Sequence, residues 1–462
     1  MAEKSAIPVE LGTEKIGRLL KQYALPAIIA QTASSLYNMV DSIFIGQGVG
    51  PLAISGLAVT FPLMNLSTAF GTLVGAGAAT MLSVLLGQKN YKAANKVLGN
   101  VVSLNVILGL LFMAVALIFI DPILYFFGAS ENTLPYAKEY IQIILYGNIV
   151  THLYFGLNAA MRSSGNPKKA MALTIFTVVF NTILDPIFIF VFDMGIAGAA
   201  WATVIAQTAA MIVVLKHFSD KSRAFHFEKG IFKLDPRVAK DSLVIGMGPF
   251  LMNAAACLVT LFINQQLRDY NGDLGIGSYG ICNRFIFMFI MICMGLNQGM
   301  QPIAGYNYGA KQYSRVKEVF WMTAKLGTIV TTLCFCIGMF IPRLAAGIFT
   351  HDEALLNMSA EGMRILTIGF PIVGFQMIGT NFFQCLGMVK KSIILSLSRQ
   401  LLFLLPLLYC LPLWMGANGV WMSFPISDVL SAILTAILLR RLFKKFNTLK
   451  DGEESTILGS NL

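Results

Sequence analysis

Long segments without any charged residue dominate this sequence. Residues 101–120 contain no Asp, Glu, Lys or Arg, and about 20 apolar residues are what a helix needs to cross a hydrocarbon core of ~30 Å. Only 12% of the chain is charged and 56% is hydrophobic, whereas soluble domains are about one-quarter charged. We therefore expect an integral membrane protein made of helices. Spanning strands would be about half as long and would alternate apolar with polar residues, which excludes a β-barrel.

The apolar pattern predicts an all-α fold with twelve transmembrane helices. The longest connection between them, 216–240, is too short to form a domain, and no G-x-x-x-x-G-K-[ST] phosphate loop occurs in the chain. Energy from nucleotide hydrolysis by this chain is therefore excluded. The expected spans are 23–46, 52–85, 97–120, 138–161, 170–193, 195–216, 242–266, 277–306, 318–341, 360–385, 392–413 and 418–439.

The basic residues indicate how these spans are oriented. Of the 34 Lys and Arg residues, 27 lie in the N-terminal arm, in alternate loops or after residue 439, all on one side of a twelve-span zigzag. The positive-inside rule then places both termini and the 216–240 loop in the cytoplasm. Residues 1–21 lack the apolar core of a secretory signal. We expect a multi-pass protein of the cytoplasmic (inner) membrane that retains its first span.

The second half of the chain repeats the first. The turn GQKNY at 87–91 recurs as GAKQY at 309–313, and GNPKK at 165–169 recurs as GMVKK at 387–391, both 222 residues later. Six spans per copy is an even number, so the two copies enter the membrane in the same orientation and form a parallel repeat. The expected organisation is an N-lobe (1–215), a cytoplasmic linker (216–240), a C-lobe (241–445) and a flexible cytoplasmic tail (446–462).

Ionisable residues inside the spans are costly in hydrocarbon, so each needs a partner or a function. The first half contains only acids, and the second half contains three bases and one acid: Asp41 and Asp185, then Arg284, Lys325, Arg399 and Asp428. Asp428 and Arg399 lie at similar depths on adjacent spans, which predicts an ion pair. Lys325 is near a helix end, where its side chain can reach the interface.

The two first-half acids lie at matched depth. Asp41 is five residues before the outer end of its span, and Asp185 is eight residues before the outer end of its own span. A rise of 1.5 Å per residue separates them by only ~4 to 5 Å in depth. Two buried carboxyl groups without a basic partner favour uptake of a proton, because desolvation and like charge both oppose ionisation.

Further polar groups follow the helical spacing around these acids. Tyr37 and Asn38 precede Asp41, Asn181 precedes Asp185 by one turn, and Thr203 reaches the same depth on the next span. Pro186 cannot donate to the carbonyl of the residue four before it, which leaves another acceptor free. Oxygen ligands of this kind suit a proton, a small hard cation or an organic ammonium. The simpler alternative, local hydrogen bonding by each acid alone, does not account for two acids at one depth.

The chain resembles the multidrug and toxic compound extrusion (MATE) family over residues 15–445, most closely its DinF/MepA-like branch. The resemblance rests on a set of motifs that are specific only together. They are Leu25-Pro26, Asn38-Met39-Val40-Asp41, Gly87 with its basic turn, Asn158-x-x-x-Arg162-x-x-Gly165-x-Pro167, Asn181-x-x-x-Asp185-Pro186, and Gln301-Pro302-Ile303-x-Gly305-Tyr306-Asn307-Tyr308-Gly309.

The resemblance implies two six-helix lobes arranged in a V and a function as an ion-coupled antiporter that exports amphipathic organic cations. The coupling ion is H⁺ or Na⁺, with no other cofactor or metal, and the expected partners are small cationic substrates and membrane lipids. We expect a monomer that binds no nucleic acid and is not an enzyme. The implied coupling-ion ligands are Asp41, Asn181, Asp185 and Thr203, the implied cavity residues are Tyr37, Asn38 and Asn158, and Pro26 is the implied point of helix bending.

Two other functions are compatible with parts of the pattern. The same superfamily includes flippases for lipid-linked oligosaccharides and lipid II, whose cavities tend to be cationic, whereas the uncompensated charge here is negative. An intramembrane aspartyl hydrolase would use Asp41 and Asp185 as a catalytic pair. Such enzymes resemble one another in a G-x-G-D motif, which neither acid has here.

Overall fold

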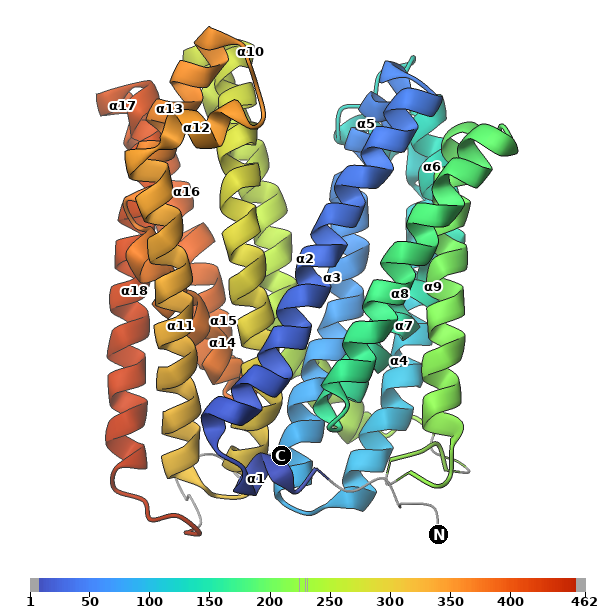
Figure 1. Cartoon of the computed structure of the whole chain (residues 1–462), viewed down its shortest axis with the longest axis vertical. Coiled ribbons are helices and arrows are strands. Elements are labelled where there is room, and N and C mark those ends of the chain that lie inside the picture. Colours follow the sequence, from blue (N-terminus) through green and yellow to red (C-terminus); the bar gives the residue numbers. More distant parts are fainter. Residues whose placement is uncertain (1–7, 224, 229, 231, 454–462) are drawn as a thin grey trace. The chain divides into compact units, whose positions relative to one another are not determined.

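The structure is a computed structural model that describes residues 8–223, 225–228, 230 and 232–453. The side chains of residues 38, 39, 51, 268 and 273 also lie outside the described part. All regular elements of the described residues are helices (Figure 1), which confirms the all-α fold. Nine of these helices are long and apolar enough to cross a membrane, or ten if the bent pair α13 (Glu353–Thr367) and α14 (Phe370–Cys385) is one span.

The first repeat supplies a helix for each of its six expected spans. Spans 23–46 and 138–161 are outside the nine or ten and correspond to α2 and to the pair α6–α7, whose members are each shorter than a full span. The elements are α1 (Glu10–Thr13), α2 (Ile16–Gly48), α3 (Pro51–Gly87), α4 (Tyr91–Ile118), α5 (Ile120–Phe126), α6 (Leu134–Tyr146), α7 (Asn148–Ser163), α8 (Pro167–Pro186), the π-helical η1 (Ile187–Val191) and α9 (Gly195–Ser219).

The second repeat begins with α10 (Pro236–Gly309), which holds two spans separated at Gly272, where φ is 62°. Such a φ favours glycine, because a side chain would clash with the backbone there. The fifth span of each repeat contains a π-helical segment, a rare form often found at functional sites. The other elements are α11 (Tyr313–Phe340), α12 (Pro342–Gly347), α13, α14, α15 (Val389–Leu397), η2 (Ser398–Leu404), α16 (Leu405–Cys410), α17 (Pro412–Met415) and α18 (Ala417–Phe446).

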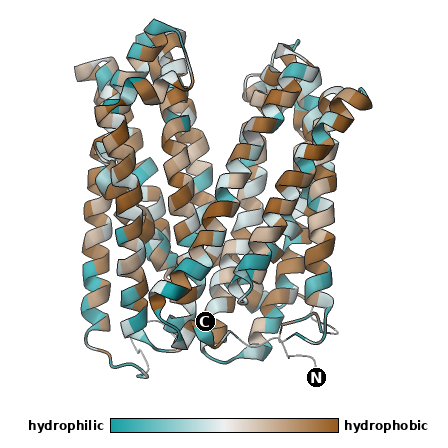
Figure 2. Cartoon of the chain, in the orientation of Figure 1, coloured by the Kyte–Doolittle hydropathy of each residue, from teal (hydrophilic) through white to brown (hydrophobic). Residues whose placement is uncertain are grey.

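Apolar residues cover the outside of the long helices. Figure 2 shows hydrophobic residues along most of their length and hydrophilic residues gathered toward the connecting segments. Large apolar side chains such as Ile118 and Phe340 are each 73% exposed. An aqueous surface would not accommodate so many exposed apolar groups, whereas a bilayer solvates them.

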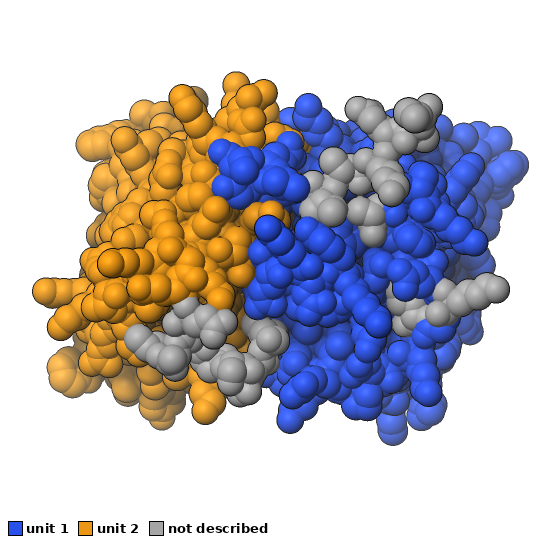
Figure 3. All heavy atoms as spheres, turned by 90° about the horizontal axis from the view of Figure 1, so that it is seen from below, with its two compact units in different colours: residues 1–13, 29–250, 462 blue, residues 14–28, 251–461 orange. Residues whose placement is uncertain are grey.

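The chain divides into two compact units, coloured separately in Figure 3. Unit 1 comprises 1–13, 29–250 and 462, and unit 2 comprises 14–28 and 251–461. These boundaries differ from the repeat boundaries at 215 and 241. The start of α2, including Pro26, belongs to unit 2, and the start of α10 belongs to unit 1.

Small residues explain how these helix starts pack. In unit 1 a Cβ added to Gly77 would lie 1.8 Å from the carbonyl oxygen of Ser242. In unit 2 a Cβ added to Gly299, 222 residues after Gly77, would lie 2.4 Å from the Cα of Ala24. Only glycine permits such close helix contact. The same packing device is therefore used once in each unit.

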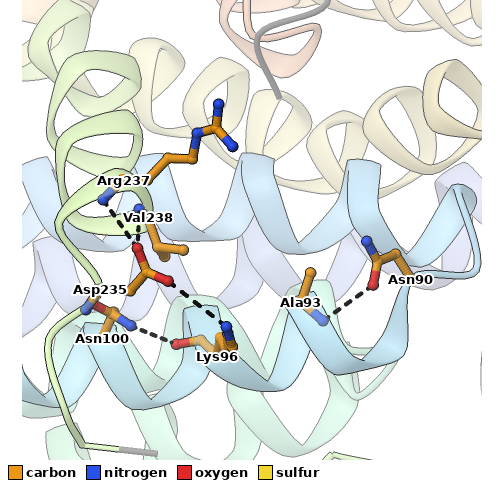
Figure 4. Close-up of polar contacts among 7 residues, drawn as sticks. All are labelled: Asn90, Ala93, Lys96, Asn100, Asp235, Arg237 and Val238. Atoms are coloured by element: carbon orange, nitrogen blue, oxygen red, sulfur yellow. Dashed lines mark hydrogen bonds and ion pairs between the residues drawn. The ribbon is translucent and has the colours of Figure 1, made fainter.

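The linker 216–240 is held against α4 of unit 1 at Asp235 (Figure 4). The backbone N–H of Asp235 donates to Asn100 Oδ1 at 2.9 Å, and its carboxylate lies 3.8 Å from Lys96 Nζ. Asp235 Oδ1 also accepts from the backbone N–H groups of Arg237 and Val238 at 3.0 and 3.5 Å. Asp235 thus caps the start of α10 and joins it to α4.

The described part of the expected flexible tail makes specific contacts with the start of α11. The hydroxyl of Tyr313 donates to the carbonyl of Glu453 at 3.2 Å, and Ser314 is hydrogen-bonded to Asp451. These contacts hold residues 447–453 in one place, because each satisfies a polar group of the helix start. Residues 454–462 of that tail lie outside the described part of the chain.

Candidate functional site

Asp41 on α2 and Asp185 near the end of α8 are both buried in unit 1, with exposed fractions of 5% and 0%. The charges of the two carboxyl groups act on each other, which places them close together as their matched depth predicts. Among the described residues, one oxygen of each carboxyl group has no hydrogen-bond partner. A buried carboxyl oxygen without a donor is costly and is suited to receive a proton or a cation.

A chain of hydrogen bonds connects Asp185 to the neighbouring helices. The amide of Asn181, one turn before it on α8, donates to Asp185 Oδ2 at 3.0 Å in the orientation that satisfies both groups. Its oxygen then accepts from the backbone N–H of Thr203 on α9 at 3.0 Å. Thr203 Oγ1 is hydrogen-bonded to the hydroxyl of Tyr37 on α2 at 2.9 Å. Side chains from α2, α8 and α9 therefore form one polar cluster.

Tyr140 on α6 is a member of this cluster that the sequence pattern did not reveal. Its side chain is 1% exposed, and its hydroxyl lies within electrostatic reach of Asp41, Tyr37 and Asp185. The available signal was its place near the outer end of the fourth span, at about the depth of Asp41. One tyrosine in an apolar span does not by itself predict a polar contact, because tyrosine also packs as an apolar residue.

An apolar cluster covers the outer side of the polar residues. Ile45, Ile189 and Ala199 each lie one helical turn outward from Asp41, Asp185 and Thr203 respectively, and they pack together with Tyr140. Phe44 and Phe190 meet edge to face at a centroid distance of 6.4 Å beside them. This packing keeps water from the carboxyl groups on that side and so strengthens any charge interaction there.

The remaining predicted site residues lie elsewhere. The amide of Asn158 on α7 donates to the carbonyl of Ala170 on α8 at 3.1 Å. Ala170 is eleven residues before Asn181, about 16 Å along the helix, so Asn158 is not part of the polar cluster. Pro26 lies inside the continuous helix α2. The side chain of Asn38 lies outside the described part of the chain.

The membrane-embedded charges of the second half are arranged differently. Arg399 Nε donates to Asp428 Oδ1 at 2.7 Å, which confirms the predicted ion pair. Lys325 is exposed, as expected for a side chain that reaches the interface. Arg284 is also exposed, and nothing in the described residues explains its place in the span.

The ligand set of the polar cluster limits which ions it can hold. It offers two carboxyl groups, an amide, a threonine hydroxyl and two phenols, which are all oxygen or nitrogen groups without sulfur or imidazole. The described residues contain no group of three or more His, Cys, Asp or Glu side chains able to hold a metal ion. Such a set suits a proton or Na⁺ better than a transition metal.

Comparison with known proteins agrees with this architecture. The MatE family model matches twice, at residues 26–187 and 249–410, once in each repeat. The multidrug export protein MepA of Staphylococcus aureus is 28% identical over 92% of this chain and 94% of its own length.

Solved structures show the same fold. The MATE multidrug transporter DinF-BH, solved as a complex with a small molecule, is 37% identical and has a TM-score of 0.88 over 95% of this chain and 98% of that chain. An outward-facing MATE transporter of the MOP superfamily has a TM-score of 0.90 over 97% of this chain and 100% of that chain at 22% identity. Because the family model covers most of the sequence in two copies, this chain is a multi-pass membrane protein that belongs to the MATE family of transporters.

Proposed function

We propose that this protein is a multidrug efflux antiporter that exchanges H⁺ or Na⁺ for amphipathic organic cations across the cytoplasmic membrane, with both termini in the cytoplasm. The observation that carries the proposal is the pair of buried carboxyl groups, Asp41 and Asp185, each with one unpartnered oxygen among the described residues. No Lys, Arg or His side chain of the described residues acts electrostatically on either one. The names of MepA and DinF-BH, multidrug export protein and multidrug transporter, support this direction.

The antiport cycle follows from competition for the same oxygen atoms. With a proton or Na⁺ at Asp41 and Asp185, the site is neutralised and does not attract an organic cation. When the ion leaves toward the cytoplasm, two negative charges remain in a site of low dielectric and attract a cation strongly. Tyr37, Asn181 and Thr203 hold the carboxyl groups in place during this exchange. Pro26 allows α2 to bend between the two states, because proline interrupts the helical hydrogen bonding.

Transport by the purified full-length protein in proteoliposomes tests this proposal. We expect movement of ethidium, a fluorescent organic cation, to be driven by a pH gradient or a Na⁺ gradient imposed separately, which also identifies the coupling ion. In equilibrium measurements, raising the pH through neutrality should strengthen ethidium binding, because the carboxylates must be empty to receive it. Binding that is indifferent to pH and to both gradients, together with tight binding of a lipid pyrophosphate, would favour a flippase instead.

A further inference from the structure

A cavity of about 360 Å³ lies between α7, α8 and α9 in unit 1, apart from the carboxyl cluster. It is open to the surface, since Phe176 and Val213 on its wall are 42% and 47% exposed. Its lining is apolar except at one end, where Lys169 and His217 stand; the apolar residues are Met161, Ala172, Leu173, Phe176 and Val213. A mainly apolar cavity of this size with a few polar groups is typical of a ligand site.

The polar end of the cavity is positively charged. Lys169 is in the first turn of α8 and His217 is in the last turn of α9, at the end of unit 1 where the basic loops emerge. The positive charge of Arg223 in the linker is close enough to act on both. Neither Lys169 nor His217 forms an ion pair within the described ranges of the chain.

One acidic group lies near this end and is already engaged. Asp220 Oδ2 is 3.2 Å from Arg223 Nε, and Asp220 Oδ1 accepts from the hydroxyl and the backbone N–H of Ser222 at 2.7 and 3.0 Å. The hydrogen bonds from Ser222 hold the pKa of Asp220 below its usual range, so its carboxylate stays charged. Lys169 and His217 therefore remain available to an anion that approaches along the cavity.

We propose that this cavity binds one anionic phospholipid of the leaflet on the side of the basic loops. Its phosphate lies against Lys169 and His217, with Arg223 behind them, and an acyl chain fills the apolar part beside Leu173 and Phe176. Charge complementarity identifies the headgroup, and the exposed apolar wall identifies the chain, because only a lipid offers both parts at this place. A basic pocket between transmembrane helices on the cytoplasmic side is a known type of anionic-lipid site.

Binding of fluorescent phosphatidylglycerol to the purified full-length protein in neutral detergent tests the proposal. We expect unlabelled phosphatidylglycerol to displace the probe, phosphatidylcholine to displace it much less well, and inorganic phosphate not to displace it. Equal displacement by phosphatidylcholine would show a site without headgroup selectivity. Full displacement by inorganic phosphate would show a simple anion site. Either result overturns the proposal.

Three variants locate the bound lipid. Lys169→Gln should weaken phosphatidylglycerol binding roughly five-fold, as removal of one basic group near an anionic headgroup does. Lys390→Gln, which neutralises an exposed lysine at the start of α15 in the other repeat, should leave it unchanged. Ala172→Phe keeps every charge and occupies the cavity, so it should weaken lipid binding but not selectivity for the headgroup.

These variants keep the proposal open to refutation even if one of them folds poorly. Helix content and thermal unfolding of the lipid-free variants separate a folding defect from a lost lipid site. Wild-type affinity in a folded Lys169→Gln, or in a folded Ala172→Phe, would refute the proposal. Because these residues are remote from Asp41 and Asp185, ethidium binding at the carboxyl cluster should be unchanged in all three.

Discussion

The two repeats share one fold but treat their buried acids in opposite ways. In the first repeat Asp185 is 0% exposed, next to another acid and without a basic partner among the described residues. In the second repeat Asp428 is 2% exposed and paired with Arg399, whose side chain is 25% exposed. Both sites adjoin the π-helical segment of a fifth span, η1 or η2. The backbone arrangement is thus repeated, and only the side chains make one site chargeable and the other permanently neutralised.

The paired site acts as a structural contact by this comparison. A buried ion pair contributes little net stability compared with apolar residues, but losing one partner leaves a buried charge. The unpaired site is costly to the fold in the same terms, since a charged carboxyl group in a dry site is unfavourable. Its retention is explained by function, because a group that changes charge during transport cannot be permanently paired.

The largest expected effect is in the unpaired site. Asp41→Asn and Asp185→Asn should each abolish ion-coupled ethidium export while the protein stays folded, because a carboxamide has nearly the same shape but cannot gain or lose the charge. Export assays in cells, with protein levels measured in the membrane, would show this. Asp193→Asn, an exposed position just after η1, is the matched control and should retain export. Normal export by either site variant at normal protein levels would contradict the assignment.

An intermediate effect is expected in the paired site, on stability. Arg399→Met should destabilise unit 2 by about 3 kcal/mol, because it leaves Asp428 buried without a counter-charge. The double variant Arg399→Met/Asp428→Leu should recover most of this loss, since no buried charge remains. Thermal unfolding in detergent measures both, with ethidium transport as a second readout that should persist in the double variant. Additive losses from the two substitutions would mean that the two side chains are not coupled.

The smallest expected effect concerns the residues around the unpaired site. Tyr37→Phe removes the hydroxyl that is hydrogen-bonded to Thr203, at a cost of about 1 kcal/mol for one such bond. We expect the affinity for the coupling ion to fall several-fold, measured by competition between the ion and ethidium. Tyr146→Phe, at a tyrosine on α6 that is 59% exposed, should have no effect. Equal behaviour of the two variants would remove Tyr37 from the site.

Part of the site could be predicted from sequence because helices in a membrane have simple geometry. A constant rise per residue and a known span boundary give the depth of each residue, so Asp41 and Asp185 could be placed at one level without a structure. The Arg399–Asp428 pair was predictable for the same reason. Depth does not give the direction of a side chain around its helix, and Asn158, expected in the cavity, bonds to the backbone of α8 instead.

The sequence by itself determined the membrane class, the parallel repeat and the imbalance of buried charge, because these depend on composition, spacing and period. Only the tertiary structure decided that Tyr140 joins the acids, that the starts of α2 and α10 pack in units other than those of their repeats, and that Lys169 and His217 stand at one end of a cavity. Each of these is a contact between residues far apart in the chain. Such contacts depend on how helices rotate and pack against one another, which a single sequence read by period and depth does not specify.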